Sequence, residues 1–474
     1  MTLMNWQEKM NEKQDSLLSD LISLLRIKSV KDPGSSSASA PMGERVAEAL
    51  EFMLGKARKD GFRTKNIEGY AGYAEMGPED AEGYIAVLCH VDVVPASAGW
   101  TSPPFEPEIR EGKLFGRGAI DDKGPTMAAY YAFSLLKELG LPLKHRVRII
   151  FGTDEESGMS CMAKYLETEP HPITGFAPDA DFPIIYAEKG QVNLQLDYQK
   201  EDTSAIAGDI QVLSFQSGER ANVVPDSAEA VLFGQGLSDA AERFKSYCRK
   251  QKLEGSSSID QDQLTLNVKG QSAHAMEPEK GINAAAHLAS FLSSEKLDSR
   301  GQGYMEFIAG HLAGDHYGKG LSIDFSDEIT GPLTVNPGIF RYGTEEAFIH
   351  LNIRCPVKTP YEEMHQNLEE TARTHGFRIS GLRERLPHHV DKNHPLIKTL
   401  QRVYLEETGL EPSLLTTGGN TYARMINNGV AFGALFPGRE DKAHQKDEYI
   451  IIEDLLKAAA IYVRAIHELA NLDY

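Results

Sequence analysis

Two apolar runs rich in β-branched residues end directly in charged side chains. Residues 84–94 read YIAVLCHVDVV and contain His90 and Asp92, whereas residues 146–156, RVRIIFGTDEE, end in three adjacent acids. Largely apolar runs of this length are typical of strands that are buried on both faces of a parallel sheet. Because ligands bind beyond the carboxyl ends of such strands, the charged ends are the first candidates for a functional site.

Helical patterns alternate with these strands. Apolar residues recur at helical spacing in residues 16–28, Glu44–Lys59 and 125–140, and another short strand, FPIIYAEKG, follows at 182–190. This alternation predicts an α/β fold, with a mixed, mostly parallel sheet and flanking helices.

The pattern changes near Gln191. Segments such as QVNLQLDYQ and LTLNVKG alternate apolar and polar residues, as do strands of an antiparallel sheet with one covered face. The helix-and-strand pattern returns near Pro387 and continues to the last helix. We therefore predict that residues 1–190 and 386–474 form one α/β domain, and that residues 191–385 form an α+β domain inserted into it.

The charge balance and the cysteines narrow the class of protein. Sixty-nine acidic and 49 basic side chains among 474 residues give a formal net charge of −20. This balance argues against nucleic acid or an anionic membrane as a partner, because both require a basic surface. The four cysteines are scattered and form no CxxC pair, and we find neither an apolar signal region nor a run long enough to span a membrane. We expect a cytoplasmic protein.

His90 and Asp92 lie two residues apart, so both side chains point to the same face of the strand. A carboxylate beside an imidazole can orient it as a metal ligand. Taken alone, however, the HVD motif favours a solvated loop.

Two further acidic motifs allow a structural or a chemical interpretation. In GRGAIDDKGP the adjacent Asp121 and Asp122 repel each other unless a cation or a proton intervenes, although acids are also common where a helix begins. Of Glu155 and Glu156, one could bind a cation while the other takes a proton from water. The alternative is an acidic cap on the helix that follows.

Eight sequence segments, taken together and in their order along the chain, indicate a protein family far more specifically than any one motif does. They are CHVDVVPASAGWTSPPF, GRGAIDDKGP, GTDEESG, FAPDADFPIIYAEKG, ANVVPD, QSAHAMEP, NIRCP and FGALFPGREDKAHQKDEYI. The chain resembles the two-metal aminoacylase and glutamate carboxypeptidase (ArgE/DapE-like) metallopeptidases over nearly its whole length. The chain length, the DDKGP form and the PDADFP box resemble the PepV-type dipeptidases within that family.

The resemblance implies a zinc exopeptidase-like catalytic domain, formed by residues 1–190 and 386–474, and a lid domain at 191–385 that binds substrate. It implies two divalent metal ions, most consistently Zn²⁺ with Mn²⁺ as the alternative. His90 and Asp179 would bind one ion, Glu156 and His444 the other, and Asp121 both, just before a cis peptide bond to Asp122. Asp181 competes with Asp179 for the metal role, and the PDA pattern of the family favours Asp179.

The remaining implied roles concern catalysis and substrate. Asp92 would orient His90, and Glu155 would be the general base on a water shared by the two metal ions. In the inserted domain, His274 would stabilise the oxyanion, Arg354 would pair with the substrate carboxylate, and Asn222 would donate to either group. The TTGGNTYAR loop would add backbone contacts through Gly418 and Gly419. It departs from the family at Asn420, where a third glycine is usual, which leaves the substrate preference open.

The predicted function is hydrolysis of dipeptides that have free amino and carboxyl ends. An N-acyl-amino-acid amidohydrolase or a carboxypeptidase-like enzyme of the same fold is the nearest alternative, because Arg354 fits these as well. An alternative of another class is a catalytically silent binding or scaffold homologue, against which the full ligand set and the intact Glu155 weigh. The long insertion can supply His274 from its own chain, so we expect a monomer.

Overall fold

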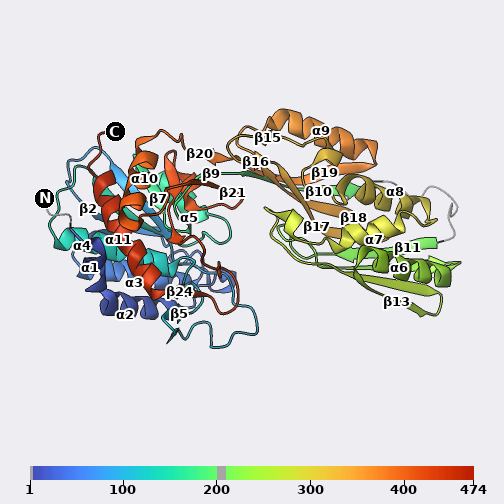
Figure 1. The fold of residues 1–474 in the computed structure, drawn as a ribbon, viewed down its shortest axis with the longest axis horizontal. Helices are drawn as coiled ribbons and strands as arrows, with labels where there is room; N and C mark the ends of the chain where they lie inside the picture. Colours follow the sequence, from blue (N-terminus) through green and yellow to red (C-terminus); the bar gives the residue numbers. More distant parts are fainter. Residues whose placement is uncertain (1–3, 200–209) are drawn as a thin grey trace. The chain divides into compact units, whose positions relative to one another are not determined.

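The computed structural model of the protein describes residues 4–199 and 210–474, which form two compact units. The first unit comprises Met1–Ala187, His389–Leu415 and Asn420–Tyr474, and the second comprises Glu188–His388 and Thr416–Gly419. Figure 1 labels many of their helices and strands.

The first unit is built on a nine-stranded mixed sheet. β3 lies at its centre, parallel to both β6 and β7, while β1 and β2 extend one edge in antiparallel fashion. The strands in spatial order are β1 (Arg63–Ile67), β2 (Ala71–Met76), β6 (Arg146–Gly152), β3 (Tyr84–His90), β7 (Thr174–Ala177), β22 (Gly429–Ala431), β9 (Ile184–Glu188) and β20 (His388–His389), with β21 (Leu414–Thr417) beside β9.

Helices cover both faces of this sheet, as the continuous apolar pattern of β3 requires. Val87 and Cys89 face one layer, and Ala86 and Leu88 face the other. The first layer contains α1 (Trp6–Asn11), α2 (Gln14–Leu25), α3 (Glu44–Lys59), α4 (Lys123–Glu138), α10 (Pro395–Thr408) and α11 (Ile452–Leu469). The second contains α5 (Ser160–Thr168) and the short helix η5 (Tyr422–Met425). Within the first layer, α4 packs against α11 (Figure 1).

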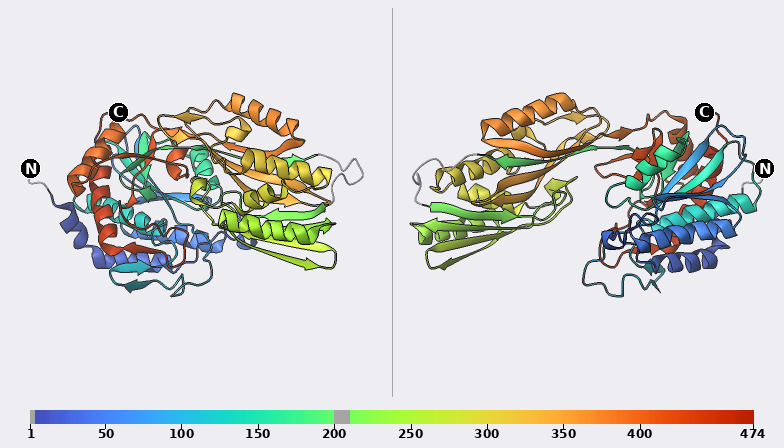
Figure 2. Two further views of the ribbon diagram at one scale, coloured as in Figure 1. Left: turned by 45° about the vertical axis from the view of Figure 1, so that its right-hand side comes forward. Right: turned by 180° about the vertical axis from the view of Figure 1, so that it is seen from behind.

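The second unit is an eight-stranded antiparallel sheet with helices on one face (Figure 2). Its strands in spatial order are β13 (Glu254–Asp260), β14 (Gln263–Lys269), β12 (Ser227–Gly234), β11 (Ile210–Ser217), β17 (Thr334–Tyr342), β18 (Ala347–Cys355), β10 (Gly190–Tyr198) and β19 (Phe377–Arg385). The helices are α6 (Leu237–Gln251), α7 (Ala284–Leu292), α8 (Ser299–Phe307) and α9 (Tyr361–Thr374). β10 alternates buried and half-buried residues, which places its apolar side chains on the helix-covered face.

Small elements complete the two units. β4 (Glu108–Arg110), β5 (Lys113–Phe115) and β24 (Tyr449–Ile451) form a three-stranded sheet, and β8 (Ala180–Asp181) pairs with β23 (Ala434–Leu435). The others are β15 (Ser326–Asp327), β16 (Gly331–Pro332), and the single turns η1 (Pro33–Ser35), η2 (Pro278–Lys280), η3 (Ile308–Leu312) and η4 (Lys319–Leu321).

The structure confirms the predicted fold class, an α/β unit together with an α+β unit. The helix expected over Glu44–Lys59 has those bounds, but the helix expected over 16–28 spans Gln14–Leu25. At that end the buried Lys123 Nζ donates to Leu24 O and Ile27 O at 3.1 and 2.7 Å, and so satisfies carbonyl groups near the end of the helix. The four cysteines are buried and free.

No helix among the described residues combines the length and the apolarity needed to cross a membrane.

Candidate active site

Three predicted site segments meet at one edge of the sheet in the first unit. β3 ends at His90, β6 is followed by Glu155 and Glu156, and β7 is followed by Asp179. Because β6 and β7 flank β3 and run parallel to it, their carboxyl ends are neighbours. This is the edge at which open α/β sheets bind ligands.

Five of the predicted residues form two adjacent groups around Asp121. His90 Nε2 lies 3.1 Å from Asp121 Oδ1 and 3.6 Å from Asp179 Oδ2. His444 Nε2 lies 2.9 Å from Asp121 Oδ2 and 2.9 Å from Glu156 Oε2. The two carboxylate oxygens of Asp121 thus face different histidines, and each group of three residues could hold a metal ion.

The loop that carries Asp121 is tightly shaped. The Asp121–Asp122 peptide bond is cis, as predicted, and Gly118 has a φ of 89° that disfavours other residues. At Gly124 a Cβ atom would lie 2.1 Å from Ala119 O, so only glycine fits. The buried Asp122 accepts a hydrogen bond from the backbone N–H of His90 and therefore joins this loop to the end of β3.

Asp92 connects the other segments of the site. Its backbone carbonyl lies 3.0 Å from His90 Nδ1 and accepts that N–H, which turns Nε2 of the ring toward Asp121 and Asp179. Its carboxylate oxygens accept the backbone N–H groups of Glu155 and Glu156, both at 3.2 Å. The sequence predicted only the contact of Asp92 with His90, because hydrogen bonds to backbone N–H groups cannot be recognised from a sequence motif.

The buried carboxylates around Asp121 repel one another, and bound cations would relieve this repulsion. Burial and repulsion by neighbouring carboxylates raise the pKa of Glu155 well above its usual range, that of Glu156 to about 7 and that of Asp179 to about 6. Burial acts in the same direction on Asp121, but hydrogen bonds from His444 and His90 hold its pKa below the usual range. Oε1 of both Glu155 and Glu156 is buried and has no hydrogen-bond partner in the part of the chain described. Imidazole and carboxylate donors in two groups fit a pair of divalent cations.

We expect the affinity for these cations to fall as the pH falls. A protonated ligand cannot coordinate a metal, and the raised pKa values of Glu156, Asp179, His90 and His444 make protons compete with the cations at and above neutral pH. Each proton displaced on binding weakens the apparent affinity about tenfold per pH unit below the pKa of its group. Calorimetric titration of metal-free protein with Zn²⁺ at about pH 6 and pH 8 measures the effect. Equal affinities at the two values contradict it.

Three predicted substrate residues, Asn222, His274 and Arg354, lie together in the second unit. Val223, next to Asn222, pairs with His274 in a β-bridge, and Asn222 O accepts the backbone N–H of Ala275 at 3.0 Å. Thr334 donates to Ala275 O at 3.4 Å and lies opposite Arg354 in the pairing of β17 with β18.

Arg354 connects this cluster to the glycine loop. Its side chain is buried, with Nε donating to Asn352 Oδ1 at 2.9 Å and Nη1 to Gly418 O at 2.7 Å. A Cβ atom on Gly418 would lie 2.6 Å from Met276 Cβ, so the close approach requires glycine. Asn420 does not adopt a positive φ, so its tolerance of left-handed geometry is not needed here.

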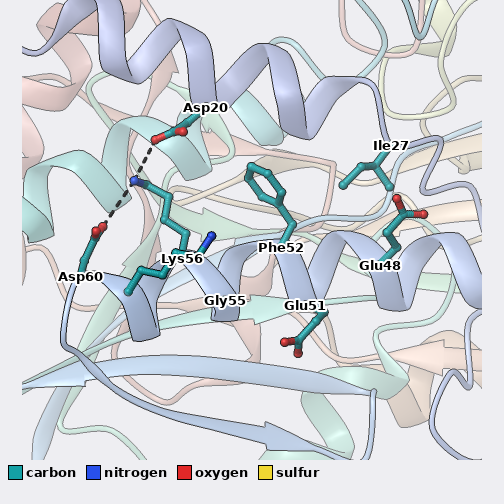
Figure 3. A pocket seen from close by; sticks show the side chains of 9 residues that line it. Asp20, Ile27, Glu48, Glu51, Phe52, Gly55, Lys56 and Asp60 are labelled. Carbon is teal, nitrogen blue, oxygen red and sulfur yellow. Dashed lines mark ion pairs between the residues drawn. The ribbon is translucent and has the colours of Figure 1, made fainter.

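A pocket on the first unit, between α2 and α3, contains none of the predicted site residues (Figure 3). Lys56 Nζ lies 2.8 Å from Asp20 Oδ2 and 3.3 Å from Asp60 Oδ2, so this ammonium group is held by two ion pairs. We interpret the pocket as a structural junction.

Comparison with known proteins supports the resemblance derived from the motifs. Residues 86–468 match the model of "Peptidase family M20/M25/M40". A protein of Bacillus subtilis (strain 168) named "Putative dipeptidase YtjP" is 46% identical over 469 residues, covering 99% of this chain and 100% of that protein. A protein of Staphylococcus epidermidis named "Putative dipeptidase" is 39% identical over 470 residues, covering 99% of this chain and 100% of that protein.

Solved structures show the same fold at low sequence identity. Human carnosine dipeptidase 1 is 15% identical with a TM-score of 0.57, and the alignment covers 98% of each chain. A tripeptidase of Staphylococcus aureus is 16% identical with a TM-score of 0.58, covering 97% of this chain and 99% of the other. The family predicted from the motifs is confirmed: this chain belongs to peptidase family M20/M25/M40 and is a peptidase.

Proposed function

We propose that this peptidase is a metal-dependent dipeptidase that requires free amino and carboxyl ends on its substrate. The observation that carries the proposal is the convergence of His90, Asp121, Glu156, Asp179 and His444 into two groups that share Asp121. The dipeptidase names of relatives that match over their whole length support it.

The proposed ligand assignment follows these groups. His90 and Asp179 would hold one cation, Glu156 and His444 would hold the other, and Asp121 would contribute to both. Zn²⁺ suits this mixture of imidazole and carboxylate, and Mn²⁺ is the alternative working ion. When bound, the cations polarise the scissile carbonyl group and lower the pKa of the attacking water.

Glu155 is the proposed general base. It follows β6, its backbone N–H is held by Asp92, and its buried Oε1 has no partner among the described residues. A buried carboxylate with a raised pKa can take a proton from water and give it to the leaving amine nitrogen. Asp92 keeps both His90 and the Glu155–Glu156 turn in place.

The second unit supplies the proposed substrate contacts. His274 Nδ1 accepts the backbone N–H of Met276 at 3.3 Å, so the neutral ring carries its proton on Nε2, as a donor to an oxyanion must. The buried Arg354 pairs with the substrate carboxylate, and Asn222, Gly418 and Gly419 add polar and backbone contacts.

The proposal also includes the domain limits, the oligomeric state and the cellular compartment. Residues 1–190 and 386–474 form the catalytic domain, and residues 191–385 form the lid that binds substrate. The enzyme acts as a monomer in the cytoplasm, with a peptide substrate and without nucleic acid or membrane.

A substrate panel tests the proposal. We expect protein loaded with Zn²⁺ or Mn²⁺ to hydrolyse unblocked dipeptides and to lose at least about 100-fold in kcat/KM on N-acetylated or C-amidated forms, since a blocked end leaves a buried polar partner unpaired. Chromatographic detection of the released amino acids gives the rates. Faster cleavage of the N-acetylated forms favours the amidohydrolase alternative, and no cleavage of any member contradicts the dipeptidase assignment.

A further inference from the structure

A buried ion pair joins the two loops that carry Asp121 and His444. Arg117 and Glu448 have side chains that are 1% and 0% exposed, and Arg117 Nη1 lies 2.6 Å from Glu448 Oε2. The two residues are 331 positions apart in the chain. A pair this deeply buried is stable only when further hydrogen bonds satisfy it.

Glu448 supplies those bonds to the segment that precedes Asp121. Its Oε2 accepts the backbone N–H of Gly118 at 3.0 Å. Its Oε1 accepts those of Ile120 at 3.0 Å and of Asp121 at 3.3 Å. One carboxylate thus binds three of the four consecutive backbone N–H groups of residues 118–121.

Arg117 acts on the other loop. Its Nη2 donates to His444 O at 3.3 Å and to Pro95 O at 3.5 Å. Directly after Glu448, β24 pairs with β5, so residues 113–121 and 444–451 form one connected structure. The side chain of His444 is 55% exposed, so packing alone does not fix its position.

We propose that Glu448 and Arg117 are positioning residues that hold His444 against Asp121 so that the second cation can bind. The proposal rests on the proposed function only in taking Glu156 and His444 as ligands of that ion. The first ion depends less on this anchor, because His90 ends β3 and Asp179 follows β7, both central strands of the sheet.

Titration of metal-free protein with Zn²⁺ alone tests the proposal. We expect wild-type protein to bind two equivalents, and Glu448→Gln to bind one about 10- to 100-fold more weakly and the other, which also uses Asp121, with a distinctly smaller loss. The reason is that a neutral amide leaves Arg117 without its counterion and presents one carbonyl oxygen to three backbone donors.

Glu169→Gln is the matched control. Glu169 is also buried and also pairs with an arginine, Arg148, at 2.8 Å, but it belongs to neither metal group. We expect this variant to unfold at a lower temperature and to bind both equivalents as the wild type does. The proposal is overturned if Glu448→Gln binds both equivalents as tightly as wild-type protein does. It is also overturned if Glu448→Gln and Glu169→Gln lose metal affinity to the same extent.

Two further readouts separate positioning from general stability. Raising the metal concentration should restore the kcat of Glu448→Gln with little change in KM, which a purely structural defect would not show. If that variant does not fold, Arg117→Lys decides, because lysine keeps the charge but cannot bridge Glu448 and His444 O together. Selective weakening of one equivalent supports the proposal, and two unchanged equivalents refute it.

The proposed function can fail separately. Wild-type protein that binds two equivalents but cleaves no dipeptide contradicts the dipeptidase assignment, while the titration still decides the role of Glu448.

Discussion

Replacing Glu155 with glutamine should lower kcat by about 10²- to 10⁴-fold while both metal ions stay bound. Glutamine preserves the size of the side chain but cannot accept the proton of the attacking water. KM should change little, because the interaction is made in the transition state. Steady-state kinetics on an unblocked dipeptide, together with metal analysis of the purified variant, measure both expectations.

Glu169→Gln serves as the control here too, since it removes a buried carboxylate of the same unit without touching the cluster. We expect it to retain wild-type kcat. Full turnover by Glu155→Gln would falsify the assignment of Glu155 as general base, and loss of bound metal in that variant would show that Glu155 acts as a ligand.

Removing the metal ions should abolish hydrolysis and lower the free energy of unfolding. Without cations, Glu155, Glu156 and Asp179 are buried carboxylates that repel one another. Ligand linkage gives about 4 kcal/mol of stabilisation at a free metal concentration 1,000 times Kd. Denaturant unfolding of chelator-treated protein, with and without added Zn²⁺, measures the difference.

Asp121→Asn extends this experiment to the shared ligand. Because Asp121 faces both histidines, the variant should bind both equivalents more weakly than wild-type protein. Activity that survives chelation, or an unfolding curve that added Zn²⁺ does not shift, argues against a metal-dependent peptidase.

The core of the fold was predictable because strands that are buried on both faces of the sheet have largely apolar sequences. β3 has no exposed residue, so its sequence shows an unbroken apolar stretch up to His90. α1 was not predicted, since a helix of six residues shows too little periodicity.

The site was predictable only where the type of a residue and its place in a sequence pattern indicate its role. His90, Glu156 and Asp179 stand at the ends of strands, which a sequence pattern can reveal. Glu448 lies in a charged stretch that looks solvent-exposed, yet it is fully buried, because its partners are backbone N–H groups more than 300 residues away. Contacts of this kind depend on the folded chain and not on any local motif.

The short return of the chain into the second unit at Thr416–Gly419 limits how this protein can be dissected. A fragment cut out at residues 188 and 388 would leave behind Gly418, whose carbonyl group accepts a hydrogen bond from the buried Arg354. In the excised fragment the buried guanidinium group of Arg354 would therefore lack one hydrogen-bond acceptor. The stability of the isolated fragment would then differ from that of the same unit in the intact enzyme.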